Sequence, residues 1–238
     1  MGNRIALFRA REDADRSAAE LRSRGFEVVL APVLRMTATG AAPPRGRFDA
    51  VVATSVNAIA LLAPAPRGAI AGLPIYVVGR RAADAAAEAG LALALQPAAD
   101  VAALAAALGE RLAARAQVLY LAGRDRKSAL EEALRAIGAD TTVLEIYVAE
   151  ARQGWSEEET TDLRRCAAAL HYSRRSAALA AALAARAGLA EHFAGMRHVC
   201  LSPDVAEPLR EAGWARVASA DAPDEAHLLA ALERAFGS

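Results

Sequence analysis

Residues 118–148 of the chain are VLYLAGRDRKSALEEALRAIGADTTVLEIYV. An apolar run from Val118 ends at Gly123, apolar residues at helical spacing lead to Gly138, and a second apolar run ends at Val148. Short apolar runs bounded by glycine indicate strands, and the spacing between them indicates a helix. This stretch therefore predicts a strand, a helix and a second strand.

The same unit opens the chain and is one of three segments that occur twice. Residues 4–33 read RIALFRAREDADRSAAELRSRGFEVVLAPV, with Gly25 at the position of Gly138. FDAVVATSVNAIALL, from Phe48, is matched by CAAALHYSRRSAALAAAL, from Cys166. IYVVGRRAADAAAEAGLALALQP and HVCLSPDVAEPLREAGWARVASA form the third pair. We expect an α/β protein of two related lobes, each a parallel sheet flanked by helices.

The linkers predict how the chain divides between these lobes. The opening unit has too little apolar surface for a stable domain, and the C-terminal segment lacks such a unit. We expect residues 1–33 and 155–238 to form one discontinuous lobe and residues 43–145 to form the other. Residues 34–42 and 146–154 would be two extended linker strands that pair side by side as a hinge.

Three further predictions concern short segments of the chain. Pro64 and Pro66 predict a loop, because proline interrupts regular hydrogen bonding. Leu91–Leu95 reads as a short strand. Glu157–Cys166 reads as a helix that follows the second linker.

Composition excludes several classes of function. The formal net charge of the 238 residues is zero, so we expect no nucleic-acid partner and no membrane partner. The two cysteines, Cys166 and Cys200, are interpreted as buried thiols of a reducing cytosol, and the four histidines show no metal-ligand spacing. No targeting segment is visible. We expect a cytoplasmic monomer without a metal.

Candidate ligand-binding residues follow the predicted strands, because open parallel sheets bind ligands beyond the carboxyl ends of their strands. These positions are rich in cationic, hydroxyl and glycine residues: Arg9, Thr54, Ser55, Asn57, Gly79, Arg80, Gly123, Arg124, Ser173, Arg174 and Ser202. The alternative is that the serines are helix N-caps, the glycines tight turns and the arginines solvated. Taken together, the pattern favours a polyanionic ligand. Nucleotide-binding glycine motifs are absent from the sequence, so nucleotide binding lacks support. If the protein is an enzyme, we expect catalysis to depend on positioning.

Five short motifs occur in an order that resembles the uroporphyrinogen-III synthase family. They are LFRARE, VVATSVNAI, YVVGRR, LYLAGRD and EIYVAEA. In the second lobe, HYSRRSA and LSPDVAEPLREAGW stand where the family often has Thr-Ser-Pro-x-Ala and Ile-Gly-Pro-x-Thr-Ala. Ala82, Ser202 and Val205 depart from the family pattern, which removes hydroxyl groups at positions 82 and 205.

The resemblance implies a lyase that acts without a cofactor in tetrapyrrole (heme) biosynthesis. Such an enzyme closes the linear tetrapyrrole hydroxymethylbilane, a substrate with eight carboxylates. It inverts the last pyrrole ring through azafulvene and spiro intermediates and releases water. Tyr147 aligns with a family tyrosine proposed to help the hydroxyl leave, although it could instead be a packing aromatic of the hinge. Tyr172 stands where the family often has threonine and is a possible substitute contact.

Two other functions stay open at this point. A two-lobed protein could bind a polycarboxylate ligand without catalysis, or it could regulate another process in the cytosol. Formation of the type III isomer from hydroxymethylbilane would distinguish the enzyme from both.

Overall fold

The apolar runs form the strands of two separate sheets. The computed structural model describes residues 3–9 and 11–237. The chain divides into two units, which we call unit 1, up to Arg35 and from Glu150 onward, and unit 2, Met36–Ala149. Residues 1, 2, 10 and 238, which the sequence assigns to the first lobe, lie outside the described residues. The exact lobe limits and the hinge stay predictions.

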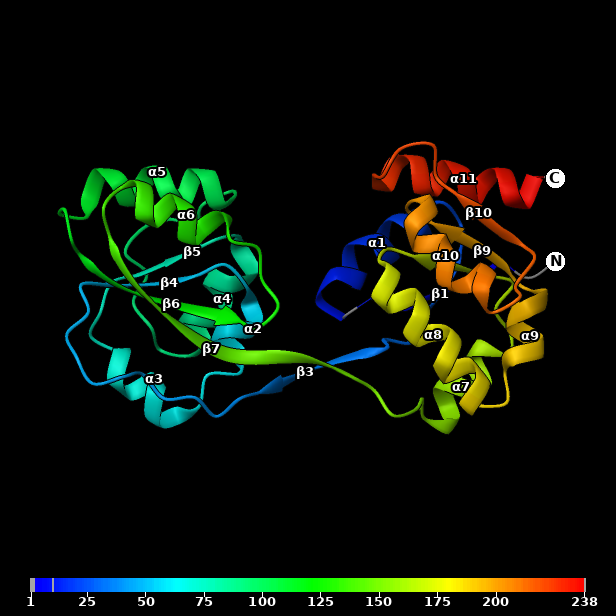
Figure 1. Ribbon diagram of the computed structural model, residues 1–238, viewed down its shortest axis with the longest axis horizontal. Helices are drawn as coiled ribbons and strands as arrows, with labels where there is room; N and C mark the ends of the chain where they lie inside the picture. The colour runs from blue at the N-terminus through cyan, green and yellow to red at the C-terminus, as the bar shows by residue number, and fades with distance from the viewer. Residues whose placement is uncertain (1–2, 10, 238) are drawn as a thin grey trace. The chain divides into compact units, whose positions relative to one another are not determined.

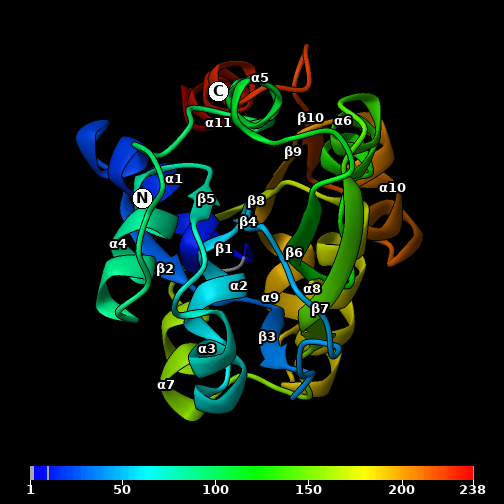
Figure 2. The same ribbon diagram turned by 90° about the vertical axis from the view of Figure 1, so that its left-hand side faces the viewer.

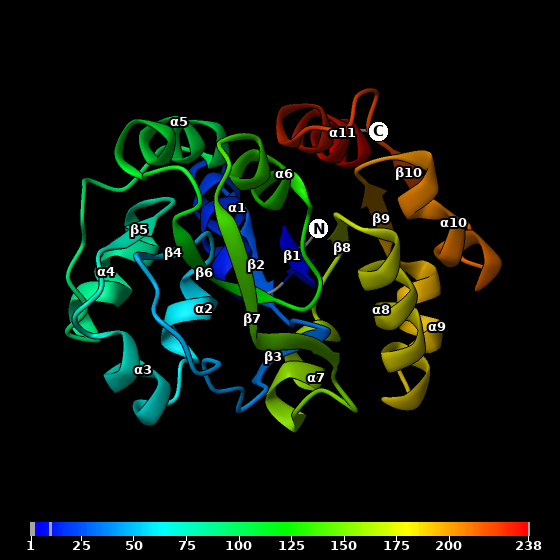
Figure 3. The same ribbon diagram turned by 60° about the vertical axis from the view of Figure 1, so that its left-hand side comes forward.

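Unit 1 is a parallel α/β layer structure. Its strands, within the described residues, form a sheet of order β10-β9-β8-β1-β2. One face is covered by α7, α8, α9 and α10, and the other by α1 and α11. Figure 3 shows α8, α9 and α10 together on their side of the strands. The elements are β1 (Arg4–Leu7), α1 (Arg11–Ser23), β2 (Glu27–Leu30), α7 (Glu157–Leu163), β8 (Ala168–His171), α8 (Arg174–Arg186), α9 (Ala190–Gly195), β9 (Arg197–Cys200), α10 (Pro203–Glu211), β10 (Val217–Ser219) and α11 (Glu225–Gly237).

Unit 2 has the same layers around a sheet of order β3-β7-β6-β4-β5. Its core consists of one apolar cluster under α2, α3 and α4 and another under α5 and α6, which lie on opposite sides of the strands (Figure 1). Figure 2 shows β6 and β7 side by side. The elements are β3 (Leu34–Ala38), β4 (Ala50–Ala53), α2 (Val56–Ala60), α3 (Pro64–Ile70), β5 (Ile75–Val77), α4 (Arg80–Glu88), α5 (Val101–Arg111), β6 (Gln117–Gly123), α6 (Ala129–Ala136) and β7 (Asp140–Ala151).

The sequence repeat is a topological repeat. The segments matched in sequence occupy matching sheet positions: β1 and β2 correspond to β6 and β7, β8 to β4, and β9 to β5. β10 corresponds to Leu93, which forms an isolated parallel bridge with Ile75. Gly25 and Gly138 both follow a helix with positive φ, +84° and +75°, a conformation that glycine adopts without strain. The prediction of two related α/β lobes is confirmed.

Three local predictions were wrong. Residues 64–70 are the helix α3 and not a loop, because Pro64 is at the start of the helix, where its missing N–H costs no hydrogen bond. Leu91–Leu95 is not a strand, since only Leu93 makes a bridge. The helix predicted to reach Cys166 ends at Leu163, and the Cys166 amide instead donates to the Leu163 carbonyl.

The core of unit 1 encloses a histidine pair that spacing alone did not reveal. Nε2 of His171 lies 3.0 Å from Nδ1 of His198, and the two side chains are 1% and 0% exposed. Nε2 of His198 also contacts the Phe193 carbonyl oxygen at 2.8 Å. Burial lowers the pKa of His198 to about 4 and holds that of His171 well below its ordinary value. Both imidazoles are therefore neutral in the folded unit.

Candidate active site

The predicted ligand-binding residues gather at the carboxyl edges of the two sheets. Because neighbouring strands are parallel and in register, the turns that follow them lie at one edge of each sheet. Unit 1 contributes Arg9, Tyr172, Ser173, Arg174 and Ser202. Unit 2 contributes Thr54, Ser55, Asn57, Gly79, Arg80, Gly123, Arg124 and Tyr147.

Tyr147 is held against Gly123. The two residues are register partners of β7 and β6, directly after a register shift between Ala122 and Gly123. A Cβ atom at position 123 would lie 2.6 Å from Cζ and 2.9 Å from the hydroxyl oxygen of Tyr147. Only glycine leaves room for the ring, so Gly123 determines where the Tyr147 hydroxyl lies. Among residues 3–9 and 11–237, that hydroxyl has no hydrogen-bond partner.

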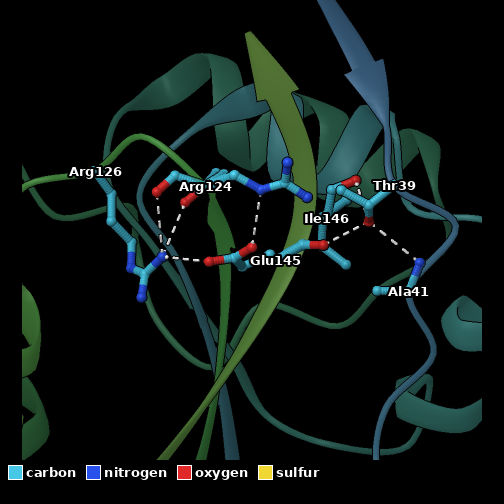
Figure 4. A network of polar contacts seen from close by, with 7 residues as sticks. Thr39, Ala41, Arg124, Arg126, Glu145 and Ile146 are labelled. Atoms are coloured by element: carbon cyan, nitrogen blue, oxygen red, sulfur yellow. Dashed lines mark hydrogen bonds and ion pairs between the residues drawn. The ribbon is translucent and has the colours of Figure 1, made fainter.

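Charged residues close in sequence to Gly123 and Tyr147 form a network, shown in Figure 4. Glu145 forms ion pairs with Arg124 at 3.3 Å and with Arg126 at 3.1 Å. Arg126 also pairs with Glu131, in the first turn of α6, at 2.8 Å. The hydrogen bonds from Arg126 and Arg124 lower the pKa of Glu145, which therefore stays ionised. The arginines that follow β6 are thus partly neutralised, which the sequence did not lead us to expect.

The other end of this network reaches Thr39, the residue after β3. The hydroxyl of Thr39 donates to the carbonyl oxygen of Glu145 at 2.5 Å, and the Thr39 amide donates to the carbonyl oxygen of Ile146 at 2.9 Å (Figure 4). The Arg124 amide donates to the Tyr147 carbonyl oxygen at 2.9 Å. The backbone on both sides of Tyr147 is therefore bonded to its neighbours.

Thr54 forms a hydrogen bond with Tyr120, a residue that was not among the predicted site residues. Oγ1 of Thr54 and the Tyr120 hydroxyl are 3.1 Å apart. Tyr120 is 3% exposed, and burial raises its pKa, so the phenol keeps its proton. This hydrogen bond fixes the direction of the Thr54 hydroxyl at the end of β4.

Several candidate residues also cap helices, as the alternative interpretation predicts. The side-chain oxygens of Ser55, Ser173 and Ser202 accept from backbone amides in the first turns of α2, α8 and α10. Gly79 caps α4 with φ +78°, and the exposed Arg80 is the first residue of that helix. The hydroxyls therefore stabilise the same helix ends whose remaining amides point beyond the sheet edge. Asn57, in α2, is half-buried.

Arg9 in unit 1 belongs to a compact polar cluster. Its guanidinium carbon lies 4.1 Å from the centre of the Tyr172 ring, and Nη1 donates to the Ser17 hydroxyl at 3.2 Å. Ser17 donates to Oε1 of Glu225 at 2.5 Å, and the Tyr172 hydroxyl donates to the same oxygen at 3.1 Å. Burial raises the pKa of Tyr172 to about 12.

Arg174 has a different environment. It is ion-paired with Asp204, at 2.9 Å, and with Glu207, both on α10. These contacts connect the beginnings of α8 and α10, so this arginine helps to hold the two helices together. Contact with a ligand stays a prediction.

Four further residues belong to these clusters without having been predicted from the sequence: Ser17, Tyr120, Glu145 and Glu225. Glu145 left a signal, because it is a single acid within the apolar run of β7. Tyr120 left a weaker one as the polar aromatic of the buried strand β6. Ser17 and Glu225 left none, since 208 positions separate them.

No group of three or more His, Cys, Asp or Glu side chains in the described part of the chain could hold a metal ion. Every helix among the described residues is too short or too polar to traverse a bilayer.

Comparison with known proteins places this arrangement in a family. The family model described as uroporphyrinogen-III synthase HemD matches residues 15–230. The chain belongs to the uroporphyrinogen-III synthase family. This family consists of hydro-lyases of tetrapyrrole biosynthesis. The resemblance that the motifs indicated is therefore confirmed.

Solved structures of uroporphyrinogen-III synthases are similar to the chain along nearly its whole length. The enzyme from Helicobacter pylori 26695 shares the fold: it is 15% identical, with a TM-score of 0.55, and the match covers 98% of this chain and 99% of that chain. A mutant of the Thermus thermophilus enzyme is 18% identical, with a TM-score of 0.44 and 98% coverage of both chains. The wild-type Thermus thermophilus enzyme is 20% identical, with a TM-score of 0.39 and again 98% of both chains. None of the curated protein sequences compared with the chain matches it.

Proposed function

We propose that this member of the uroporphyrinogen-III synthase family converts hydroxymethylbilane into uroporphyrinogen III. The observation that carries this proposal is the family match over residues 15–230, which includes the turns that form most of the candidate site. The reaction removes the terminal hydroxyl as water to give an azafulvene. A spiro intermediate then forms, and the last pyrrole ring is inverted before the macrocycle closes.

Tyr147 is the proposed proton donor to the departing hydroxyl. Three features support this role: the ring lies on Gly123, the phenol oxygen is not engaged by the described residues, and hydrogen bonds hold the flanking backbone. A positioned acid contributes most when its geometry is fixed before the reaction.

The proposed carboxylate-binding groups are main-chain amides and arginines at the two sheet edges. Ser55, Gly79, Ser173 and Ser202 each stand at the start of a helix, where free amides favour anions. Arg9, Arg80 and Arg124 add positive charge, and Thr54, Asn57, Tyr172 and Arg174 complete the proposed set. A cytosolic location, a monomeric state and independence of cofactors are further predictions.

The deciding experiment incubates the purified protein with freshly generated hydroxymethylbilane and separates the product isomers by chromatography. The proposal predicts the type III isomer, formed faster than the spontaneous type I product. Type I alone would identify a binding or regulatory protein.

Tyr147→Phe tests the role of the phenol. We expect turnover to fall about tenfold to a hundredfold without being abolished, because positioning of the substrate supplies most of the rate. The matched control is Tyr76→Phe, in β5 of the same unit. An unchanged rate would assign Tyr147 to packing.

A further inference from the structure

The cluster around Arg9 is built around a long side chain at a ligand-binding edge. Arg9 follows β1, which lies between β8 and β2 in the sheet of unit 1. Its guanidinium is supported on one side by the Tyr172 ring and is bonded to Ser17 from α1. A guanidinium has five N–H donors in a planar fork, and a carboxylate accepts two of them side by side. The chemistry of Arg9 therefore suits an anionic group of the substrate.

The Ser17 hydroxyl connects Arg9 to Glu225. Ser17 is 0% exposed, and its oxygen accepts from the guanidinium while its proton goes to Glu225. Tyr172 donates to the same carboxylate oxygen, Oε1. The hydrogen bonds therefore run in one direction: the guanidinium donates to the Ser17 hydroxyl, and that hydroxyl donates to the Glu225 carboxylate. The raised pKa of Tyr172 keeps its phenol in the donor form this pattern requires.

This arrangement joins parts of the chain that are far apart. Arg9 and Tyr172 follow two adjacent strands, Ser17 is in the first helix, and Glu225 begins the last helix. A long arginine side chain has many rotamers, and fixing it before the ligand arrives reduces the entropy lost on binding. The cluster thus fixes the position of the arginine in advance.

We propose that Glu225, Ser17 and Tyr172 position the Arg9 guanidinium to bind one carboxylate of the substrate. The proposal deepens the proposed function and rests on it. It makes Ser17 and Glu225 positioning residues, which act through Arg9.

Glu225→Gln distinguishes positioning from simple electrostatics, because the two predict opposite changes in substrate affinity. Removing a negative charge beside an anion-binding group would, by charge alone, strengthen the binding of a polycarboxylate. If Glu225 positions Arg9, the same substitution weakens binding. We expect KM for hydroxymethylbilane to rise about fivefold, with kcat changed less than about twofold, because an amide is a weaker acceptor for two O–H donors.

The matched control is Glu233→Gln. Glu233 is a second carboxylate of α11 and pairs with Arg24 at 2.8 Å, away from Arg9. We expect its KM to equal that of the wild type. The double variant Arg9→Ala/Glu225→Gln completes the cycle: with Arg9 absent, Glu225→Gln should change KM less than about twofold. A lower or unchanged KM in Glu225→Gln would overturn the proposal. So would a rise in KM that is equally large when Glu225→Gln is made in the Arg9→Ala background.

Two further measurements keep the test decisive. If Glu225→Gln does not fold, as judged by thermal unfolding, Ser17→Ala replaces it in the same cycle, since it removes the hydroxyl that joins Arg9 to Glu225. Fluorescence titration with uroporphyrin III, a stable octacarboxylate, gives a dissociation constant without turnover. A wild-type protein that forms no type III isomer would refute the proposed function alone, whereas an unchanged dissociation constant in Glu225→Gln would refute the positioning role alone.

Discussion

The turn after β1 in unit 1 and the turn after β6 in unit 2 occupy equivalent positions in a repeated topology, yet their chemistry differs. Arg9 is bonded to a neutral hydroxyl and stacked on an aromatic ring. Arg126 is ion-paired with two carboxylates, Glu131 and Glu145. Both turns place arginines at the carboxyl edge of their sheet, with different groups beside them.

This difference indicates a division of roles between the two turns. The charge network after β6 lies beside the Gly123–Tyr147 contact, since Arg126 donates to the Gly123 carbonyl oxygen at 3.3 Å. We expect this network to hold β6 and β7 in register. The cluster after β1 places a neutral hydroxyl and an aromatic ring beside its cation. We expect the first turn to bind substrate and the second to frame the proton donor. Each of the following predictions tests that comparison.

Gly123→Ala should have the largest effect. The new Cβ would overlap the Tyr147 ring, which would have to move, because 2.6 Å is far below any ordinary carbon contact. Displacement of a catalytic group by about 1 Å typically lowers turnover about a hundredfold, and we expect kcat to fall by that order. Steady-state rates of type III formation measure it.

Gly46→Ala is the control for this substitution. It lies in the same unit, its φ is ordinary, and nothing lies within 4 Å of the added Cβ. Its kcat should match the wild type. A Gly123→Ala enzyme with kcat within about twofold of the wild type would show that the ring position is unimportant.

Acid should destabilise unit 1 before unit 2. All four histidines of the sequence lie in unit 1, and the buried pair is neutral when folded. Because the folded pKa values are depressed, this stability is complete above the unfolded value of about 6.5 and is lost as pH falls toward about 4. At about pH 5 we expect the protonation of His198 in the unfolded chain to lower the free energy of unfolding by about 2 kcal/mol, and that of His171 to lower it further.

Thiol labelling can measure this loss in unit 1 alone. Cys166 and Cys200 are free, buried and both in unit 1, and burial raises the pKa of each to about 12. We expect labelling to begin at a lower urea concentration near pH 5 than near pH 7.5. His198→Gln should reduce that difference. Equal urea midpoints at the two pH values would contradict the prediction.

Glu145→Gln should have the smallest effect. It removes the carboxylate shared by Arg124 and Arg126 and leaves more positive charge at the turn after β6. For a polycarboxylate substrate we expect KM at low salt to fall about twofold, and we expect salt to screen the difference. A higher KM would mean that this turn binds substrate through the intact network.

Local patterns in the sequence predicted most of the fold. Buried strands such as β4 and β8 appear as continuous apolar runs, and Gly25 and Gly138 end helices at equivalent points. The helix α3 was missed, because two prolines in one short segment look like a loop unless the first one begins a helix.

The candidate site was predictable only in its location. Residues that follow a strand, such as Thr54 and Arg9, are visible because parallel sheets place them at one edge. Their partners are not visible in this way, since Tyr120 is 66 positions from Thr54 and Glu225 lies in the last helix. The sequence also led us to expect more unpaired positive charge than the structure shows after β6.

The sequence by itself determined the alternation of strands and helices, the duplication, and the family, because these depend on periodicity and on the order of short motifs. Only the tertiary structure decided which side chains act together. Glycine at position 123 reads as a turn until Tyr147 is seen lying on it, and two histidines without useful spacing become a buried pair. The physical reason is that hydrogen bonds and steric contacts depend on distances in space, which folding sets between residues that are far apart in the chain.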